Sequence, residues 1–171
     1  MEGFLSPNQI LGKLTLKDDM TAADFGCGSG GWVIPLAKKL EAGLVYAIDI
    51  LEEPLSALRV KVNLAKVSNI KIIKADIEKG TPMIHESCDL ILLTNLLFEC
   101  EDKKNVVREA KRALKRGGRI LVVEWKESAS LGPKNKRVSP KEVKKIADEL
   151  ELKIEQEFEA GPFHYGLVLV K

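Results

Sequence analysis

The sequence predicts an α/β fold with a doubly wound, seven-stranded, mostly parallel sheet and an antiparallel C-terminal hairpin. Apolar runs alternate with helical patterns from residue 21 to residue 150, as in domains built from parallel strands and crossover helices. The last two runs follow each other without a helix between them, so they must pair antiparallel. A length of 171 residues suits a single domain, 1–171, in which residues 1–18 form an N-terminal helix or cap segment.

Five short apolar runs predict the parallel strands, because strands buried on both faces are apolar throughout. They cover residues 21–25, 44–50, 70–75, 89–93 and 119–125. Gly117 and Gly118 stand just before the fifth run and are predicted to end the preceding helix.

Helices are predicted from start signals and from apolar residues spaced three or four apart. Ser6 to Gln9 has the pattern of a capping box with Pro7 at the first helical position, and Ser139 with Pro140 opens the last helix. Two further helices present the apolar faces Leu55, Leu58, Val62, Ala65 and Val106, Val107, Ala110, Leu114.

The end of the chain has the pattern of a strand near a sheet edge. Two sets of residues alternate there, namely Leu152, Ile154 and Phe158 on one side and Glu151, Glu155, Glu157 and Glu159 on the other. Charge along such a strand discourages pairing with another molecule. Gly161 and Pro162 then turn the chain into a final strand over residues 165–170.

Residues 23–31 predict a ligand-binding turn between a strand and a helix that begins near Trp32. Gly26, Gly28 and Gly30 let the backbone turn sharply and approach a ligand closely. Ligands of open α/β sheets bind outside the carboxyl ends of the strands, which is where this turn falls.

Two ligand classes fit the glycine spacing. Gly26, Gly28 and Gly31 satisfy the dinucleotide fingerprint, and Asp49 follows at the interval expected of a ribose-binding acid. Asp24, just before the turn, would repel a pyrophosphate but attract a cationic amino group. A nucleoside that carries an ammonium group is therefore favoured, and a nicotinamide dinucleotide is the alternative.

Six motifs follow one another along the chain: Asp24 to Gly31, Ala47-Ile48-Asp49-Ile50, Lys74-Ala75-Asp76-Ile77, and residues 88–95, 114–126 and 161–166. In this order and spacing the chain resembles the class I S-adenosylmethionine-dependent methyltransferases along nearly its whole length. It is most similar to small members of the ubiquinone/menaquinone-type methyltransferase group. The resemblance implies a Rossmann-like methyltransferase fold and S-adenosylmethionine as the methyl donor.

The resemblance also implies a set of cofactor-binding residues: Asp24, Gly26, Gly28, Gly30, Asp49, Ile50, Asp76, Ile77 and Asn95. Of the three acids, Asp24 would bind the methionine amino group, Asp49 the ribose hydroxyls and Asp76 the adenine amine. Ile50 and Ile77 would enclose the adenine. Aspartates at strand-to-helix junctions also serve as helix caps and turn residues, which is the alternative for all three acids.

No catalytic residue is assigned, because displacement at a sulfonium methyl group needs positioning more than acid–base chemistry. Asn95, Glu99 and His164 are the candidates for contact with the acceptor; a capping role for Asn95 and a hydrogen-bonded turn role for His164 are the alternatives. Residues 124–126 could form a substrate wall. The sequence does not identify the acceptor or distinguish a small acceptor from a macromolecular one.

Composition excludes several classes of partner. A net charge of +2 gives no global electrostatic footprint for nucleic acid, and the sequence shows neither an apolar run that could span a bilayer nor a signal-peptide pattern. Cys27, Cys88 and Cys100 form no metal-ligand spacing and no disulfide framework, so we expect no metal and a cytoplasmic location. Few residues precede the core, so we expect a site that is open or completed by a homodimer or another chain.

Three functions therefore stand at this point. The favoured one is methyl transfer from S-adenosylmethionine to an unidentified acceptor by in-line displacement. The second is an S-adenosylmethionine-binding subunit without its own activity. The third is a nicotinamide-dependent oxidoreductase, for which 171 residues leave little room for a substrate domain.

Overall fold

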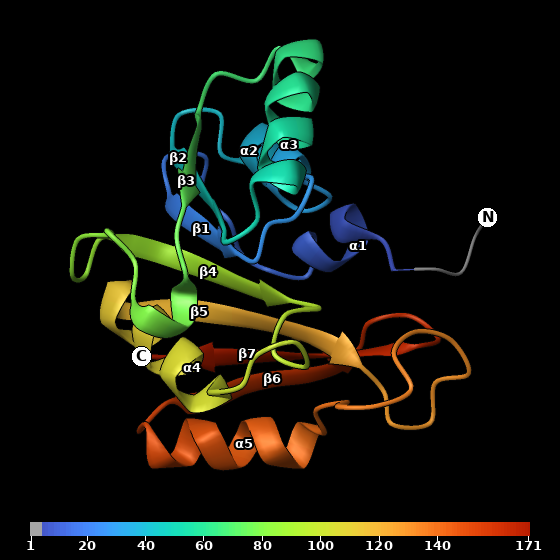
Figure 1. Cartoon of the computed structure of the whole chain (residues 1–171). Helices are drawn as coiled ribbons and strands as arrows, with labels where there is room; N and C mark the ends of the chain where they lie inside the picture. Colours follow the sequence, from blue (N-terminus) through green and yellow to red (C-terminus); the bar gives the residue numbers. More distant parts are fainter. Residues whose placement is uncertain (1–4) are drawn as a thin grey trace.

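Seven strands form one sheet in the computed structural model, which describes residues 5–171 (Figure 1). In the order β3-β2-β1-β4-β5-β7-β6, the strands are Ile70–Lys74, Leu44–Asp49, Thr21–Phe25, Cys88–Thr94, Leu114–Trp125, His164–Val170 and Lys153–Glu159. Strands β1 to β5 are parallel, whereas β7 is antiparallel to both β5 and β6. This is the predicted doubly wound sheet with its C-terminal hairpin.

Helices cover both faces of the sheet (Figure 1). On one face lie α1 (Pro7–Leu11), α2 (Val33–Lys39) and α3 (Glu52–Ala65); on the other lie the 3-10 helix η1 (Ile77–Lys79), α4 (Lys103–Ala113) and α5 (Pro140–Glu149). The helix predicted near Trp32 begins one residue later, with Trp32 at its N-cap. None of the helices in residues 5–171 is both long enough and apolar enough to cross a membrane.

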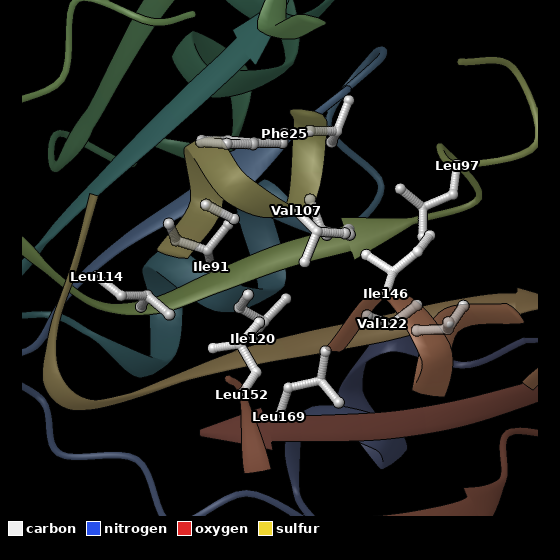
Figure 2. Packing of buried hydrophobic residues seen from close by; sticks show 14 of the residues in the cluster. Phe25, Ile91, Leu97, Val107, Leu114, Ile120, Val122, Ile146, Leu152 and Leu169 are labelled. Atoms are coloured by element: carbon white, nitrogen blue, oxygen red, sulfur yellow. The ribbon is translucent and has the colours of Figure 1, made fainter. Parts of the chain in front are cut away.

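Each face of the sheet has its own hydrophobic core, because successive strand side chains point to opposite faces. Ala22 packs with α1, α2 and α3, whereas Ala23 and Phe25 pack on the other face. Figure 2 shows part of that second core, in which strand residues such as Ile91 and Ile120 lie close to helix residues such as Val107 and Ile146. The two cores fix the strand ends, and therefore the edge of the sheet on which the predicted site depends.

The predicted capping box at the N-terminus is wrong. Ser6 has an extended backbone at the N-cap of α1, but its side chain makes no capping hydrogen bond within the described residues. This helix has only five residues and closes at Gly12, whose N–H donates to the Asn8 carbonyl at 3.0 Å. Residues 1–4 of the predicted N-terminal segment lie outside the described part of the chain.

The predicted role of Gly117 and Gly118 is also wrong, because α4 has already ended at Ala113. From Leu114 the chain is extended and pairs with Cys88 of β4. Both glycines lie inside β5: the Gly117 N–H donates to the Lys171 carbonyl and the Lys171 N–H donates to the Gly118 carbonyl, each at 3.0 Å. These two glycines therefore lie in a strand that pairs with a distant part of the chain, and they do not end a helix.

The C-terminal elements follow their sequence signals. Ser139 caps α5, with its hydroxyl accepting the Glu142 N–H at 3.1 Å. Strand β6 lies at the edge of the sheet, as its row of glutamates predicted. One of those glutamates, Glu155, pairs with Arg119 of β5 at 2.6 Å.

Candidate functional site

A cleft of about 500 Å³ opens outside the carboxyl ends of β1, β2, β3 and β4. It lies at the point where the strand order reverses between β1 and β4, where doubly wound sheets bind their ligands. Of the residues singled out in the sequence, those that line it are Gly26, Gly28, Asp49, Ile50, Asp76, Ile77, Asn95 and Glu99. Leu96, Cys100, Glu78 and Trp32 also line it and were not predicted as ligand contacts.

The glycine turn presents its backbone to this cleft. Gly26 and Gly28 both have positive φ, +69° and +51°, a conformation that side chains disfavour. The N–H groups of Gly26 and Cys27 both donate to the Ile48 carbonyl of β2, which fixes the start of the turn. A Cβ built at Gly28 meets no heavy atom of the described residues within 4 Å, so this side of the turn is open to a ligand.

Gly30 has the positive φ expected of a sharp turn, but it lies away from the cleft. It is not among the described residues that line the cleft. Its φ is +89°, and an added Cβ would lie 2.4 Å from Cδ1 of Leu58 in α3. Gly30 therefore allows the turn to pack closely against α3, and the structure does not bring it to the ligand side.

Asp24 is the most unusual polar group near the cleft. Its side chain is 1% exposed, and neither carboxylate oxygen has a hydrogen-bond partner in residues 5–171. Burial, and secondly the negative charge of Asp49, raise the pKa of the Asp24 carboxyl well above its usual value. Asp24 itself does not line the cleft, but Gly26, two residues on, does. A buried carboxyl in this position would be stabilised by a cationic group.

Asp49 lies at the end of β2, where it both shapes the turn and lines the cleft. One carboxylate oxygen accepts the Gly28 N–H and the other accepts the Leu51 N–H, both at 2.9 Å. Each carboxylate oxygen can accept more than one hydrogen bond. Asp49 can therefore hold the turn and still accept hydrogen bonds from a ligand hydroxyl.

Asp76 caps the 3-10 helix η1, which is the alternative role predicted from the sequence for the three aspartates. Its Oδ1 accepts the Glu78 N–H at 3.1 Å, and its Oδ2 pairs with the Lys79 ammonium at 2.8 Å. This hydrogen bond from Lys79 is the main reason that the pKa of Asp76 is lowered. Glu78 in turn accepts the backbone N–H groups of Glu101 and Asp102, so it holds the start of α4.

Asn95 lies at the end of β4 with a left-handed backbone, φ +50°. Its N–H donates to the Val123 carbonyl at 2.8 Å, and its buried Oδ1 has no hydrogen-bond partner in the described part of the chain. The residue that caps the following helix, α4, is Asp102. Asn95 and the exposed Glu99 both line the cleft, so the structure brings these two candidates together.

His164 is not brought to the cleft. It begins β7, is fully buried, and lies against Trp125 with ring centroids 4.1 Å apart. Burial, and secondly the charge of Lys126, lower the pKa of His164 to about 4, so the ring is neutral at physiological pH. Residues 124–126 are likewise not among the described residues that line this cleft, and their predicted role as a substrate wall stays a prediction.

The sheet order and the acid-lined cleft at its switch point define the class of Rossmann-like α/β domains. The chain belongs to the methyltransferase domain family, because residues 23–122 match the family model described as "Methyltransferase domain". The matched region runs from β1 into β5 and contains the lining residues of the cleft.

A curated relative and a solved structure agree with this family. A demethylmenaquinone methyltransferase from Geobacillus sp. (strain WCH70) is 25% identical over 121 residues, which are 70% of this chain and 51% of the relative. The chain thus spans about half the length of this curated relative. A crystal structure of a SAM dependent methyltransferase from Aquifex aeolicus has a TM-score of 0.90 and 27% identity, covering 96% of this chain and 89% of that one.

A second solved structure bears on the fold alone. The [4+2]-cyclase SpnF has a TM-score of 0.82 at 14% identity, and the match covers 96% of this chain and 79% of that one. The comparisons confirm the predicted Rossmann-like methyltransferase fold. Family and fold together imply S-adenosylmethionine as the cosubstrate.

Proposed function

We propose that this chain binds S-adenosylmethionine in the cleft and transfers its methyl group to an acceptor by in-line displacement. The observation that carries the proposal is the buried Asp24 carboxyl, which has no hydrogen-bond partner in residues 5–171. It lies at the base of a glycine turn whose backbone is open to the cleft at Gly28. A pyrophosphate would add negative charge beside this carboxyl, whereas the amino group of a methionine would offset it.

Each half of the ligand has residues that fit it. Asp24 would bind the amino group directly or through water, and Asp49 would accept hydrogen bonds from the ribose hydroxyls. Ile50 and Ile77 line the cleft near the ends of β2 and β3, where they would enclose the adenine, and the ionised Asp76 would accept its amino group. When bound, S-adenosylmethionine supplies a methyl group that its sulfonium already activates.

The residues of the cleft suit a reaction that depends on positioning. Holding two reactants in line contributes on the order of 7–11 kcal/mol to lowering a barrier. Asn95 and Glu99 are the polar side chains available to orient an acceptor at the end of β4. The curated relative is named for demethylmenaquinone, so a demethylated quinol belongs in the first panel of acceptors.

A second candidate function is cofactor binding without methyl transfer. One observation favours keeping it: a protein titled a [4+2]-cyclase shares this fold, so the fold does not fix the reaction. A nicotinamide-dependent oxidoreductase is less well supported, because Asp24 disfavours a diphosphate and the family match is to methyltransferases.

Thermal unfolding with added ligands separates these functions. At 100 times its dissociation constant, S-adenosylhomocysteine should add about 2.7 kcal/mol to the free energy of unfolding. For a domain of this size, that is a rise in Tm of roughly 5–11 °C. A shift with NADH and none with S-adenosylhomocysteine would refute the proposal. Binding without turnover across the acceptor panel would favour the second candidate.

The Asp49→Ala variant tests the ribose assignment within the same experiment. It should abolish most of the shift with S-adenosylhomocysteine, because it removes the acceptor for the ribose and the hydrogen bond from Gly28 that holds the glycine turn. Glu157→Gln, on the edge strand β6, is the matched control and should respond like the wild type. A full shift in Asp49→Ala would remove the assignment.

A further inference from the structure

We propose that Glu124 is a positioning residue, which holds the segment 95–97 in place as a wall of the cleft. Glu124 is the penultimate residue of β5, where an acid stands in an otherwise apolar run. Its side chain is 0% exposed and does not touch the cleft itself. The inference rests on the proposed function only in taking the cleft as the cofactor site.

A single oxygen of Glu124 organises the segment. Oε1 accepts the N–H of Leu96 at 2.9 Å and the N–H of Leu97 at 2.6 Å. The preceding N–H, that of Asn95, donates to the Val123 carbonyl at 2.8 Å. Three successive N–H groups that leave β4 are thus bound to the end of β5, and two of them depend on one carboxyl.

The segment held in this way forms the boundary between the core and the cleft. Leu97 is fully buried in the core beneath it (Figure 2). Leu96 lines the cleft and packs against the glycine turn, so closely that a Cβ at Gly26 would lie 2.6 Å from its Cδ1. Asn95 is kept in a left-handed conformation that an unrestrained asparagine adopts only occasionally. A change in the path of residues 95–97 would therefore alter the glycine turn and the cleft together.

The charge of Glu124 is set by its surroundings. Burial raises its pKa to about 7, although the N–H groups of Leu97 and Leu96 oppose the rise. The titratable groups near it are Glu99, which raises its pKa further, the Cys100 thiol, and Tyr165 on β7, whose hydroxyl donates to the Val138 carbonyl at 2.8 Å. Hydrogen bonds to an ionised acceptor are roughly twice as strong as neutral ones, so the hold on residues 95–97 weakens as pH falls through 7.

Two substitutions separate the acceptor role from simple core filling. Glu124→Gln keeps an oxygen at the same place but stays neutral at every pH. Glu124→Leu fills the space and leaves the N–H groups of Leu96 and Leu97 buried without an acceptor. A residue that only fills the core would tolerate leucine better than a polar amide, whereas a positioning residue would tolerate glutamine better.

The test measures the Kd of S-adenosylhomocysteine and the amide exchange rates of Leu96 and Leu97. At pH 8 we expect Glu124→Gln to bind within about threefold of the wild type, whereas Glu124→Leu binds at least about tenfold more weakly. Exchange of the two amides should be faster by at least about tenfold in Glu124→Leu. Between pH 8 and 6, the Kd of the wild type should rise relative to that of Glu124→Gln.

Three results would overturn the inference: wild-type affinity in Glu124→Leu, equal loss in both variants, or unchanged amide exchange. If Glu124→Leu does not fold, the pH dependence of the wild type against Glu124→Gln decides by itself. If the wild type does not bind S-adenosylhomocysteine, the proposed function fails, and amide exchange still tests whether Glu124 holds residues 95–97.

Discussion

The Asp24 carboxyl destabilises the ligand-free protein, since it is buried and has no hydrogen-bond partner within residues 5–171. The pKa of this carboxyl is raised in the folded state. Its cost to the free energy of unfolding is therefore absent below the usual pKa of 3.8 and grows as pH rises above it. At pH 7 the folded protein therefore carries a penalty that a bound cation would relieve. A residue that lowers stability in this way is expected at a binding site rather than in a structural core.

The Asp24→Asn variant should move stability and affinity in opposite directions. Without ligand, we expect its free energy of unfolding to rise by about 1–3 kcal/mol, because the ionisable group is gone. Its affinity for S-adenosylhomocysteine should fall roughly 10- to 150-fold, the equivalent of a charge-assisted hydrogen bond. Urea denaturation and isothermal titration measure the two quantities. A variant that is less stable but binds normally would show that Asp24 is structural.

Gly28 and Gly30 form a matched pair that separates binding from packing. Alanine at either position is strained by about 1–2 kcal/mol, because both residues have positive φ. At Gly30 the new methyl group also overlaps Leu58, which adds about 1–3 kcal/mol of destabilisation. At Gly28 it enters the cleft instead. We therefore expect Gly28→Ala to lose more affinity for S-adenosylhomocysteine and Gly30→Ala to lose more stability, in parallel denaturation and titration experiments. The reverse ranking would contradict these placements.

At the scale of elements, the loop 126–138 is braced by the guanidinium of Arg137. It donates to five carbonyl oxygens of the same loop, those of Lys126, Glu127, Ala129, Leu131 and Pro133, at 2.6–3.1 Å. The guanidinium of Arg137 is thus engaged within the loop itself. Gly132 packs under the ring of Trp125, where an added Cβ would lie 2.5 Å from it.

Replacing Arg137 by lysine should loosen this loop, because a single ammonium group cannot reproduce the planar fork of donors. We expect a loss of about 1–3 kcal/mol in unfolding free energy and faster proteolytic cleavage within residues 126–138. Lys134→Ala, at an exposed position of the same loop, is the control. Equal cleavage rates in wild type and Arg137→Lys would show that the hydrogen bonds do not brace the loop.

Elements defined by local patterns were predictable from the sequence, and those defined by distant pairing were not. Strand β1 has its predicted bounds, Thr21–Phe25, because an apolar run ends where the glycine turn begins. Strand β5 starts at Leu114, five residues before the predicted residue 119. The segment 114–118 has no strand pattern in the sequence, and its first residue joins the sheet by pairing with Cys88 of β4. The site follows the same rule. Asp49 could be found from its spacing to the glycines, whereas Leu96 enters the cleft on a path that Glu124 sets from another strand.

At the scale of the whole molecule, two buried groups give the stability opposite dependences on pH. The pKa of His164 is lowered from 6.5 to about 4, so its contribution is present above 6.5 and is lost as pH falls toward 4. The pKa of Glu124 is raised from 4.5 to about 7. Its contribution to the free energy of unfolding is therefore present below pH 4.5 and is lost as pH rises toward 7. The folded protein thus prefers both groups neutral.

The His164→Gln variant tests this account and the position of His164 together. In the wild type, the unfolded chain takes up a proton on His164 below pH 6.5 that the folded state does not bind. The free energy of unfolding should therefore fall by up to about 3 kcal/mol more in the wild type than in His164→Gln between pH 7 and pH 4. Denaturation curves across this range, compared with those of Glu124→Gln and Asp24→Asn, assign each slope to its group. Because His164 is not among the described residues that line the cleft, the variant should bind S-adenosylhomocysteine like the wild type at pH 7. An unchanged slope would mean that another group takes up the proton, and a loss of binding would return His164 to the candidates for the site.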